Sequence, residues 1–185
     1  VILALLSIVS SFSVLSVGVS AAADVKFSYN PALALSYAER NWNNGVGLCS
    51  DFASKCIQAG GINVYKPKCT DLYRELNGTY GTSYKLTLTR GNKGSIKMSD
   101  NEGKLVKGDL VFYFCNACRS FEHVVICNGA NIWGYAQDYA HNKAHNGKKQ
   151  TYTYYHCGQD NWTMYSIHFD EGEKLYGERT NVVAP

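Results

Sequence analysis

The chain has 185 residues, of which 45% are hydrophobic and 18% charged, and its formal net charge is +3. This length suits one domain with a sizeable core, and the composition excludes a disordered chain or a polyelectrolyte. The net charge is too small to indicate nucleic-acid binding, so no nucleic-acid partner is expected.

The N-terminal segment carries an export pattern. Residues 1–23 are uncharged and mostly apolar, and they end in Ala21-Ala22-Ala23 before Asp24. An apolar segment followed by small residues is typical of a secretory signal peptide and its cleavage site. We therefore expect a signal peptide over 1–23 and one secreted domain over 24–185, with no membrane contact after cleavage. An uncleaved anchor is the alternative, since the stretch is nearly long enough to span a bilayer.

Helical patterns follow in the N-terminal half. Asn30-Pro31 predicts a helix start, because Asn is a good N-cap and Pro suits the first turn. A second helix is expected from Cys49 to Gly60, with one apolar face and with Gly60-Gly61 ending it. A third is expected from Thr70 to Asn77. We expect residues 78–104 to form a loop with a possible strand at Tyr84–Leu88.

Short apolar runs typical of strands begin after Leu105. A turn is expected at residues 107–109, and Asn128-Gly129 is a strong hairpin signal. Helices followed by antiparallel strands indicate an α+β fold. The expected strands are Leu110–Phe114, His123–Cys127, Ile132–Gln137, Thr151–Tyr155 and Tyr165–Phe169.

Seven cysteines are many for this length, and the number is odd. Because exported proteins meet an oxidising compartment, we expect three disulfides and one thiol left over. Cys127–Cys157 and Cys56–Cys69 are possible bridges. Cys115-Asn116-Ala117-Cys118 is by itself only a weak zinc signal, and no metal is expected. The triplets at Asn77 and Asn161 are glycosylation sequons if the source is eukaryotic, which would make the protein a glycoprotein.

Cys49 is the candidate reactive thiol. It lies at the predicted start of the second helix, where the helix dipole favours a thiolate, whereas Cys56 lies two turns later on the buried face. His123, at the start of a predicted strand, is the candidate base that a thiolate nucleophile needs. The alternative is that Cys49 is one half of a disulfide and that His123 has no catalytic role.

Two blocks of sequence resemble a known superfamily. The stretch Leu48-Cys49-Ser50-Asp51-Phe52-Ala53, continuing to Gly60-Gly61, resembles the nucleophile helix of papain-like cell-wall cysteine peptidases of the NlpC and CHAP type, closest to the putative amidase-domain family. Lys107-Gly108-Asp109-Leu110-Val111-Phe112 resembles the family's Gly-Asp-Leu-x-Phe strand. Glu122-His123-Val124-Val125-Ile126 resembles its His-Val-x-Ile strand. The resemblance covers about Pro31 to Asp138 and implies a papain-like fold, with helices carrying the nucleophile on a sheet carrying the histidine.

The resemblance also implies residue roles. Cys49 would be the nucleophile and His123 the general base. Asp138, on the strand after the hairpin, is the first choice for the residue that orients His123, with Gln137 and His141 in reserve. Tyr37 and Asp51 are the substrate-binding candidates. The second oxyanion donor, beside the Cys49 backbone N–H, would come from the first helix or the loop before it, where Tyr29 and Tyr37 are the candidates.

The implied function is a secreted, monomeric cysteine hydrolase that needs no cofactor. It would cleave amide bonds of bacterial peptidoglycan, in the stem peptide or between sugar and peptide, through a thioester. Acyl transfer or deamidation on the same fold is one alternative, because both share the thioester. A non-catalytic, disulfide-rich extracellular binding protein is another, and the state of Cys49 discriminates between an enzyme and this binding protein.

Overall fold

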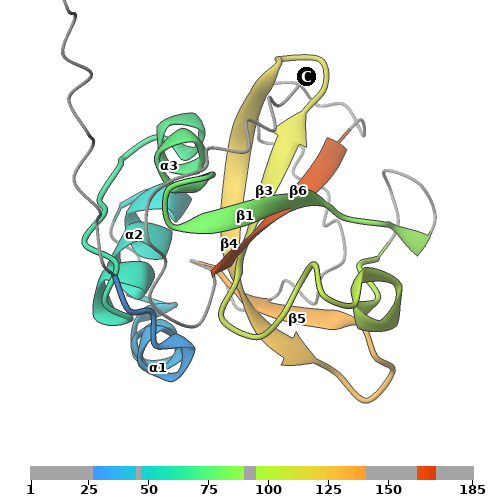
Figure 1. Ribbon diagram of the computed structural model, residues 1–185, viewed down its shortest axis with the longest axis horizontal. Helices are drawn as coiled ribbons and strands as arrows, with labels where there is room; N and C mark the ends of the chain where they lie inside the picture. Colours follow the sequence, from blue (N-terminus) through green and yellow to red (C-terminus); the bar gives the residue numbers. More distant parts are fainter. Residues whose placement is uncertain (1–26, 45–46, 90–94, 141–161, 170–185) are drawn as a thin grey trace, which may run out of the picture.

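The computed structural model describes residues 27–44, 47–89, 95–140 and 162–169. Three helices lie together on one side of a five-stranded sheet with the order β1-β6-β3-β4-β5 (Figure 1). All neighbouring strands are antiparallel, so the expected α+β class is confirmed. The elements are α1 (Pro31–Asn41), α2 (Cys49–Ala59), α3 (Cys69–Leu76), β1 (Gly81–Lys85), the 3₁₀ helix η1 (Met98–Asn101), β3 (Leu110–Cys115), β4 (Ser120–Ala130), β5 (Ala136–Tyr139) and β6 (Trp162–Phe169).

The helix ends follow local chemistry. The Asn30 side chain accepts hydrogen bonds from the N–H groups of Ala32 and Leu33, at 3.0 and 3.2 Å, so it caps α1 as expected. Helix α2 ends at Gly60, whose N–H reaches the Cys56 carbonyl at 3.1 Å. The first two predicted helices are confirmed, and α3 begins one residue earlier than expected.

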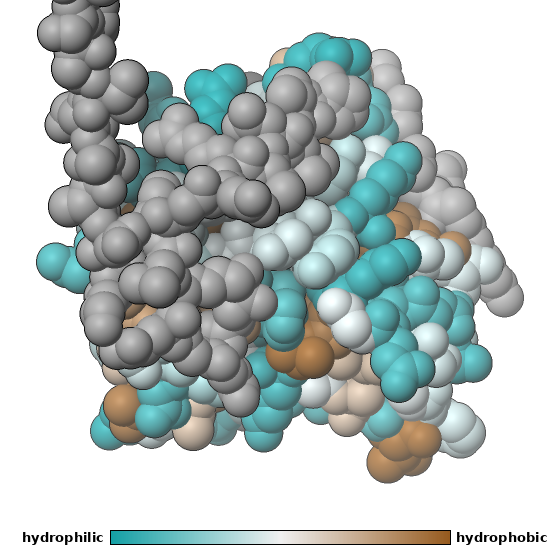
Figure 2. Space-filling model, viewed as in Figure 1, coloured by the Kyte–Doolittle hydropathy of each residue, from teal (hydrophilic) through white to brown (hydrophobic). Residues whose placement is uncertain are grey.

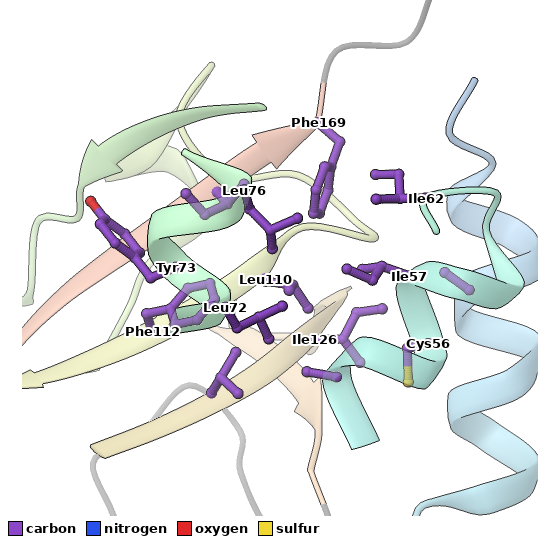
Figure 3. Close-up of a cluster of buried hydrophobic side chains, with 14 of the residues drawn as sticks. Cys56, Ile57, Ile62, Leu72, Tyr73, Leu76, Leu110, Phe112, Ile126 and Phe169 are labelled. Carbon is purple, nitrogen blue, oxygen red and sulfur yellow. The ribbon is translucent and has the colours of Figure 1, made fainter. Parts of the chain in front are cut away.

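The helices pack on the sheet through an apolar core. On α2, Phe52 and Ile57 are buried, while Lys55 and Gln58 face solvent as the pattern predicts. Aromatic rings fill the space beneath α3, where Tyr73 stacks on Phe121 at 4.0 Å between centroids. Figure 3 shows side chains from both layers meeting in this core: Cys56, Ile57, Ile62, Leu72, Tyr73, Leu76, Leu110, Phe112, Ile126 and Phe169.

The hairpin between β4 and β5 forms, but its turn is not at the predicted place. Asn128 and Gly129 lie inside β4, and the chain turns over residues 131–134. The pairing register shifts between Cys127 and Gly129, and Gly129 has a φ of +105°. The positive φ that makes Asn-Gly a turn signal is used here for a β-bulge, which lengthens the strand. The strand predicted at Ile132–Gln137 is accordingly shifted along the chain, and β5 is Ala136–Tyr139.

The segment predicted as a polar loop contains more structure than expected. Residues 81–85 form edge strand β1, and residues 98–101 form η1. The buried side chain of Asn101 organises this segment, since its Nδ2 donates to the carbonyls of Thr87 and Lys97 and its Oδ1 accepts from the Thr87 N–H. A single buried amide that replaces backbone pairing leaves no periodic signal in the sequence.

A second apolar cluster covers the sheet face opposite the helices. Leu86, Ile96 and Leu105, from the segment around η1, pack there against inward-facing residues of β3, β4 and β6. On the face shown in Figure 2, hydrophobic residues form small patches separated by hydrophilic ones. Among the described residues, no helix has the length and apolar character needed to cross a membrane. The predicted signal peptide, the strand at 151–155 and Asn161 lie outside the described residues.

Gly108 is required by both conformation and packing. Its φ is +99°, and a Cβ at this position would lie 2.4 Å from the Cβ of Pro31 at the start of α1. Gly103 has a similar φ of +70° but open space around it. We expect Gly103→Ala to destabilise the protein by about 1–2 kcal/mol, the penalty of a left-handed conformation. Gly108→Ala should lose about 1–3 kcal/mol more through overpacking. Urea denaturation of both variants measures the difference, and equal losses would contradict the packing argument.

Candidate active site

Cys49 is the first residue of α2 and is half-buried. The preceding residue, Leu48, is 62% exposed, and Gly47 has a φ of +96° that directs the chain into the helix. As the first helical residue, Cys49 has a backbone N–H with no acceptor inside the helix. The thiol and an N–H donor therefore lie together at the positive end of the helix dipole.

His123 comes from β4, far along the chain, and the tertiary structure brings it to Cys49. Its imidazole hydrogen-bonds the Cys49 sulfur, and the backbone N–H of Val124 donates to the same sulfur. The His123 side chain is buried, and its ring centroid lies 5.3 Å from that of Tyr113. Pairing of β4 with β5 begins only at Ile126. The predicted nucleophile and base are thus in contact at the part of β4 that precedes this pairing.

These contacts change the acidity of the thiol. The largest influence on the pKa of Cys49 is a hydrogen bond from Cys69, which lowers it. Burial raises this pKa, whereas the hydrogen bond and positive charge of His123 lower it further. Together they lower the pKa of Cys49 to about 4. Cys49 is therefore a thiolate at neutral pH, which is the form that acts as a nucleophile.

Cys69 is the site residue that the sequence did not reveal. It is the buried first residue of α3, and its sulfur lies 3.5 Å from that of Cys49. Because it donates its S–H to the Cys49 thiolate and is itself buried, its pKa is raised. In the sequence, Cys69 immediately precedes the helix predicted from Thr70 and is named only as a possible bridge to Cys56. Neither feature says which other helix start lies beside it.

Asp138 is buried in β5, opposite Cys127 in the pairing register. Alternation along β4 places Cys127 and His123 on the same face of the sheet, four residues apart. Asp138 therefore shares a sheet face with His123 but is not directly opposite it. Gln137 is half-buried beside the bulge, and His141 lies outside the described residues.

The two tyrosines named for the oxyanion site have different positions. The Tyr29 hydroxyl donates to the Gly108 carbonyl at 2.7 Å, so it is a buried link between the chain before α1 and the turn before β3. Because this hydroxyl donates its proton to the Gly108 carbonyl, it does not serve as a donor to an oxyanion. Tyr37, on α1, is half-buried against the core, and its carbonyl accepts from the Asn41 side chain.

Asp51 caps helix α2, which begins at Cys49. One carboxylate oxygen accepts from the Leu48 N–H at 2.7 Å, and the other accepts from the Tyr65 hydroxyl. A carboxylate in the first turn is also favoured by the helix dipole. These contacts give Asp51 a structural role in holding Cys49 at the helix start.

The expected set of three disulfides is wrong. Five of the described cysteines are free thiols, namely Cys49, Cys56, Cys69, Cys118 and Cys127. The suggested bridges Cys56–Cys69 and Cys127–Cys157 are therefore absent. Cys56 is buried in the helix layer and Cys127 on the opposite face of the sheet, and burial raises the pKa of both thiols. Geometry, and not the parity of the cysteine count, singles out Cys49.

A metal role finds no support in the described part of the chain. Cys115 is disulfide-bonded, so it cannot act as a thiolate ligand. No group of three or more His, Cys, Asp or Glu side chains that could hold a metal ion occurs among the described residues. The site is built from two thiols, an imidazole and backbone donors.

Comparisons with known proteins add no family to this geometry. A scan against protein-family models gives no match, and searches of curated proteins and of solved structures give none either. The chemistry of the site must therefore be argued from its own residues.

Proposed function

We propose that the protein is a cysteine hydrolase that cleaves amide bonds through a thioester. The observation that carries this proposal is the contact of Cys49, at the start of α2, with His123 on β4, in surroundings that hold the sulfur as a thiolate. A thiolate at a helix N-terminus paired with an imidazole is the arrangement that activates a cysteine nucleophile.

The expected reaction has two steps. The Cys49 thiolate attacks the amide carbonyl carbon, the C–N bond breaks, and His123 gives its proton to the leaving amine. Water then attacks the thioester while His123 accepts its proton, and the acid and the thiolate are released. The backbone N–H of Cys49 is placed to donate to the oxyanion in both steps. None of these steps requires a cofactor.

We further propose a papain-like arrangement and bacterial peptidoglycan as the substrate. The helices lie on one side of the sheet, with the thiol on a helix and the histidine on a strand (Figure 1). The peptidoglycan assignment rests on the resemblance of the Cys49 helix and the His123 strand to cell-wall peptidases. A secreted monomer that meets its substrate outside the cell fits this assignment.

Asp138 is proposed as the positioning residue for His123, with Gln137 and His141 as the reserves. A carboxylate beside the imidazole would hold its tautomer and stabilise the imidazolium. Replacing Asp138 with Asn should reduce kcat and shift the pH profile of kcat if it acts through His123. Gln137→Ala is the matched comparison on the same strand. A Gln137 or His141 variant with the larger effect would reassign the role. Tyr37 and Asp51 remain the proposed substrate contacts, Asp51 in addition to its structural role at the start of α2.

The test uses purified peptidoglycan and its soluble disaccharide-peptide fragments as probes. The protein should release new amino groups, and mass spectrometry of the products should identify the bond. A cut within the stem frees the amine of a stem residue, whereas a sugar–peptide cut separates the glycan from the whole stem. Cys49→Ala and His123→Ala should each lower the rate at least about 10³-fold.

Cys118→Ser is the control, because Cys118 is a free, exposed thiol and is not among the groups that act on Cys49. Its activity should equal that of the unchanged protein. Products that carry an added amine, when one is supplied, would indicate acyl transfer in place of hydrolysis. Full activity in Cys49→Ala, or binding of the probes without turnover by the unchanged protein, would overturn the proposal.

A further inference from the structure

The proposed mechanism does not use Cys69, although it is the thiol nearest to the nucleophile. The two sulfurs are 3.5 Å apart, and both belong to the first residues of helices. Cys69 is 7% exposed, whereas Cys49 is half-buried and reachable from solvent. A sulfur that solvent can reach therefore lies next to a second sulfur that is shielded from solvent.

The connection between α2 and α3 fixes this pair. The Ser50 hydroxyl donates to the Pro67 carbonyl at 2.6 Å, and the Ser54 hydroxyl accepts from the Lys66 N–H at 3.2 Å. These bonds hold the residues before Cys69 against the first two turns of α2. The start of α3 is also tied to β4, because the Phe121 N–H donates to the Thr70 hydroxyl. The approach of the two thiols is thus set by the backbone and not only by side-chain rotation.

We propose that Cys49 and Cys69 form a reversible disulfide when the protein meets a hydroperoxide or a low-molecular-weight disulfide, and that this bond switches the proposed hydrolase off. The regulatory part of the proposal rests on the function proposed above. A disulfide has an S–S distance of about 2.05 Å, so the sulfurs must approach by roughly 1.5 Å. Small side-chain rotations at two adjacent helix starts can supply this movement.

The reaction with a hydroperoxide balances in two steps. The Cys49 thiolate attacks one peroxide oxygen, the O–O bond breaks, and with one proton taken up the products are the Cys49 sulfenic acid and water or an alcohol. The Cys69 sulfur then attacks the Cys49 sulfur, the S–O bond breaks, and water leaves with the Cys69 proton. The two thiols have lost two electrons and the peroxide has gained them.

A low-molecular-weight disulfide reaches the same product by exchange. Cys49 first forms a mixed disulfide and expels one thiolate, and Cys69 then displaces the second thiol. The order of attack follows from the site. Cys49 is the thiolate and the exposed partner, whereas Cys69 is protonated, buried and close to the negative charge of Glu122, which also raises its pKa. Cys69 therefore acts second, as the resolving thiol.

The experiment treats the whole protein with a few equivalents of hydrogen peroxide, or with oxidised glutathione, near pH 7. A non-reducing peptide map should show a Cys49–Cys69 cross-linked peptide, and hydrolase activity should fall and return with dithiothreitol. In Cys69→Ala, peroxide should instead carry Cys49 to sulfinic acid, and dithiothreitol should not restore activity. Cys118→Ser is the matched control and should behave like the unchanged protein.

Two outcomes would overturn the proposal. One is oxidation of Cys49 in the unchanged protein to sulfinic acid or to a mixed disulfide while Cys69 remains a thiol. The other is formation of the cross-link without loss of an established hydrolase activity. Absence of any hydrolase activity would count against the proposed function alone, because the cross-link is read by mass and not by turnover.

Discussion

The rate at which iodoacetamide alkylates Cys49 is expected to stay nearly constant from about pH 5.5 to 8.5, because a thiol with a pKa of about 4 is already deprotonated throughout. A free thiol with a pKa of about 8.5 should react roughly 500-fold faster at the upper end of this range than at the lower. The flat profile is more diagnostic than the absolute rate. Lowering a thiol pKa also lowers its nucleophilicity, which offsets much of the gain in thiolate.

The measurement is peptide mapping after brief, limiting alkylation at each pH, with glutathione as the external reference. Cys69→Ala should move the midpoint of the Cys49 profile upward, because it removes the hydrogen bond with the largest influence on the thiolate. His123→Ala should move it in the same direction. A Cys49 midpoint near that of glutathione in the unchanged protein would contradict the activated-thiolate interpretation of the site.

Replacing Asp109 with Ala is expected to destabilise the protein by about 2–4 kcal/mol, because each buried donor left without an acceptor costs about 1–3 kcal/mol. The Asp109 carboxylate is 2% exposed and lies 3.1 Å from Nδ1 of His168 on β6. It also accepts from the Val106 N–H at 2.8 Å and from the Phe169 N–H at 3.4 Å. The side chain thus joins the turn before β3 to the end of β6, and truncation leaves buried donors without acceptors.

Asp109→Asn is the matched variant, because the amide keeps an acceptor for the Val106 N–H while it loses the charge and the acceptor for the Phe169 N–H. Burial raises the pKa of Asp109, and the contacts with His168 only partly offset this. Because the pKa of Asp109 is higher in the folded than in the unfolded state, the folded state binds the proton more tightly. The ionised carboxylate therefore destabilises the fold, and this penalty disappears as the pH falls through the folded pKa. The stability of the unchanged protein relative to Asp109→Asn should therefore rise toward acid pH in urea titrations. A difference that is constant with pH would show that the charge is not the relevant property.

Helix starts and strand cores were predictable because their signals are local. Asn30-Pro31 and Gly60-Gly61 mark helix ends through hydrogen bonds and dihedral angles within a few residues. The apolar run that became β3 is buried on both sides, between the helices and the segment around η1, and such burial is visible as an unbroken apolar run. The Asn128-Gly129 signal identified a positive φ correctly but could not show whether a turn or a bulge uses it.

The disulfide expectation failed for a related reason. Composition and the export pattern say how many cysteines could pair, but pairing depends on distances between segments. Cys56 and Cys127 lie on opposite faces of the sheet, in two separate apolar clusters. The cysteine that does lie beside Cys49, which is Cys69, belongs to a helix whose position is set by contacts of Ser50 and Ser54 with residues 66 and 67.

The sequence by itself determined the α+β class, the limits of α1 and α2, and the choice of Cys49 and His123, since periodicity, capping and the two resembling blocks are properties of short stretches. Only the tertiary structure decided that Cys49 contacts His123, that Cys69 contacts both Cys49 and the core, and that Asp51 and Tyr29 serve the framework. These are contacts between residues 12 or more positions apart, or hydrogen bonds chosen among several local partners. They are fixed by the packing of helices on the sheet, which no local pattern encodes.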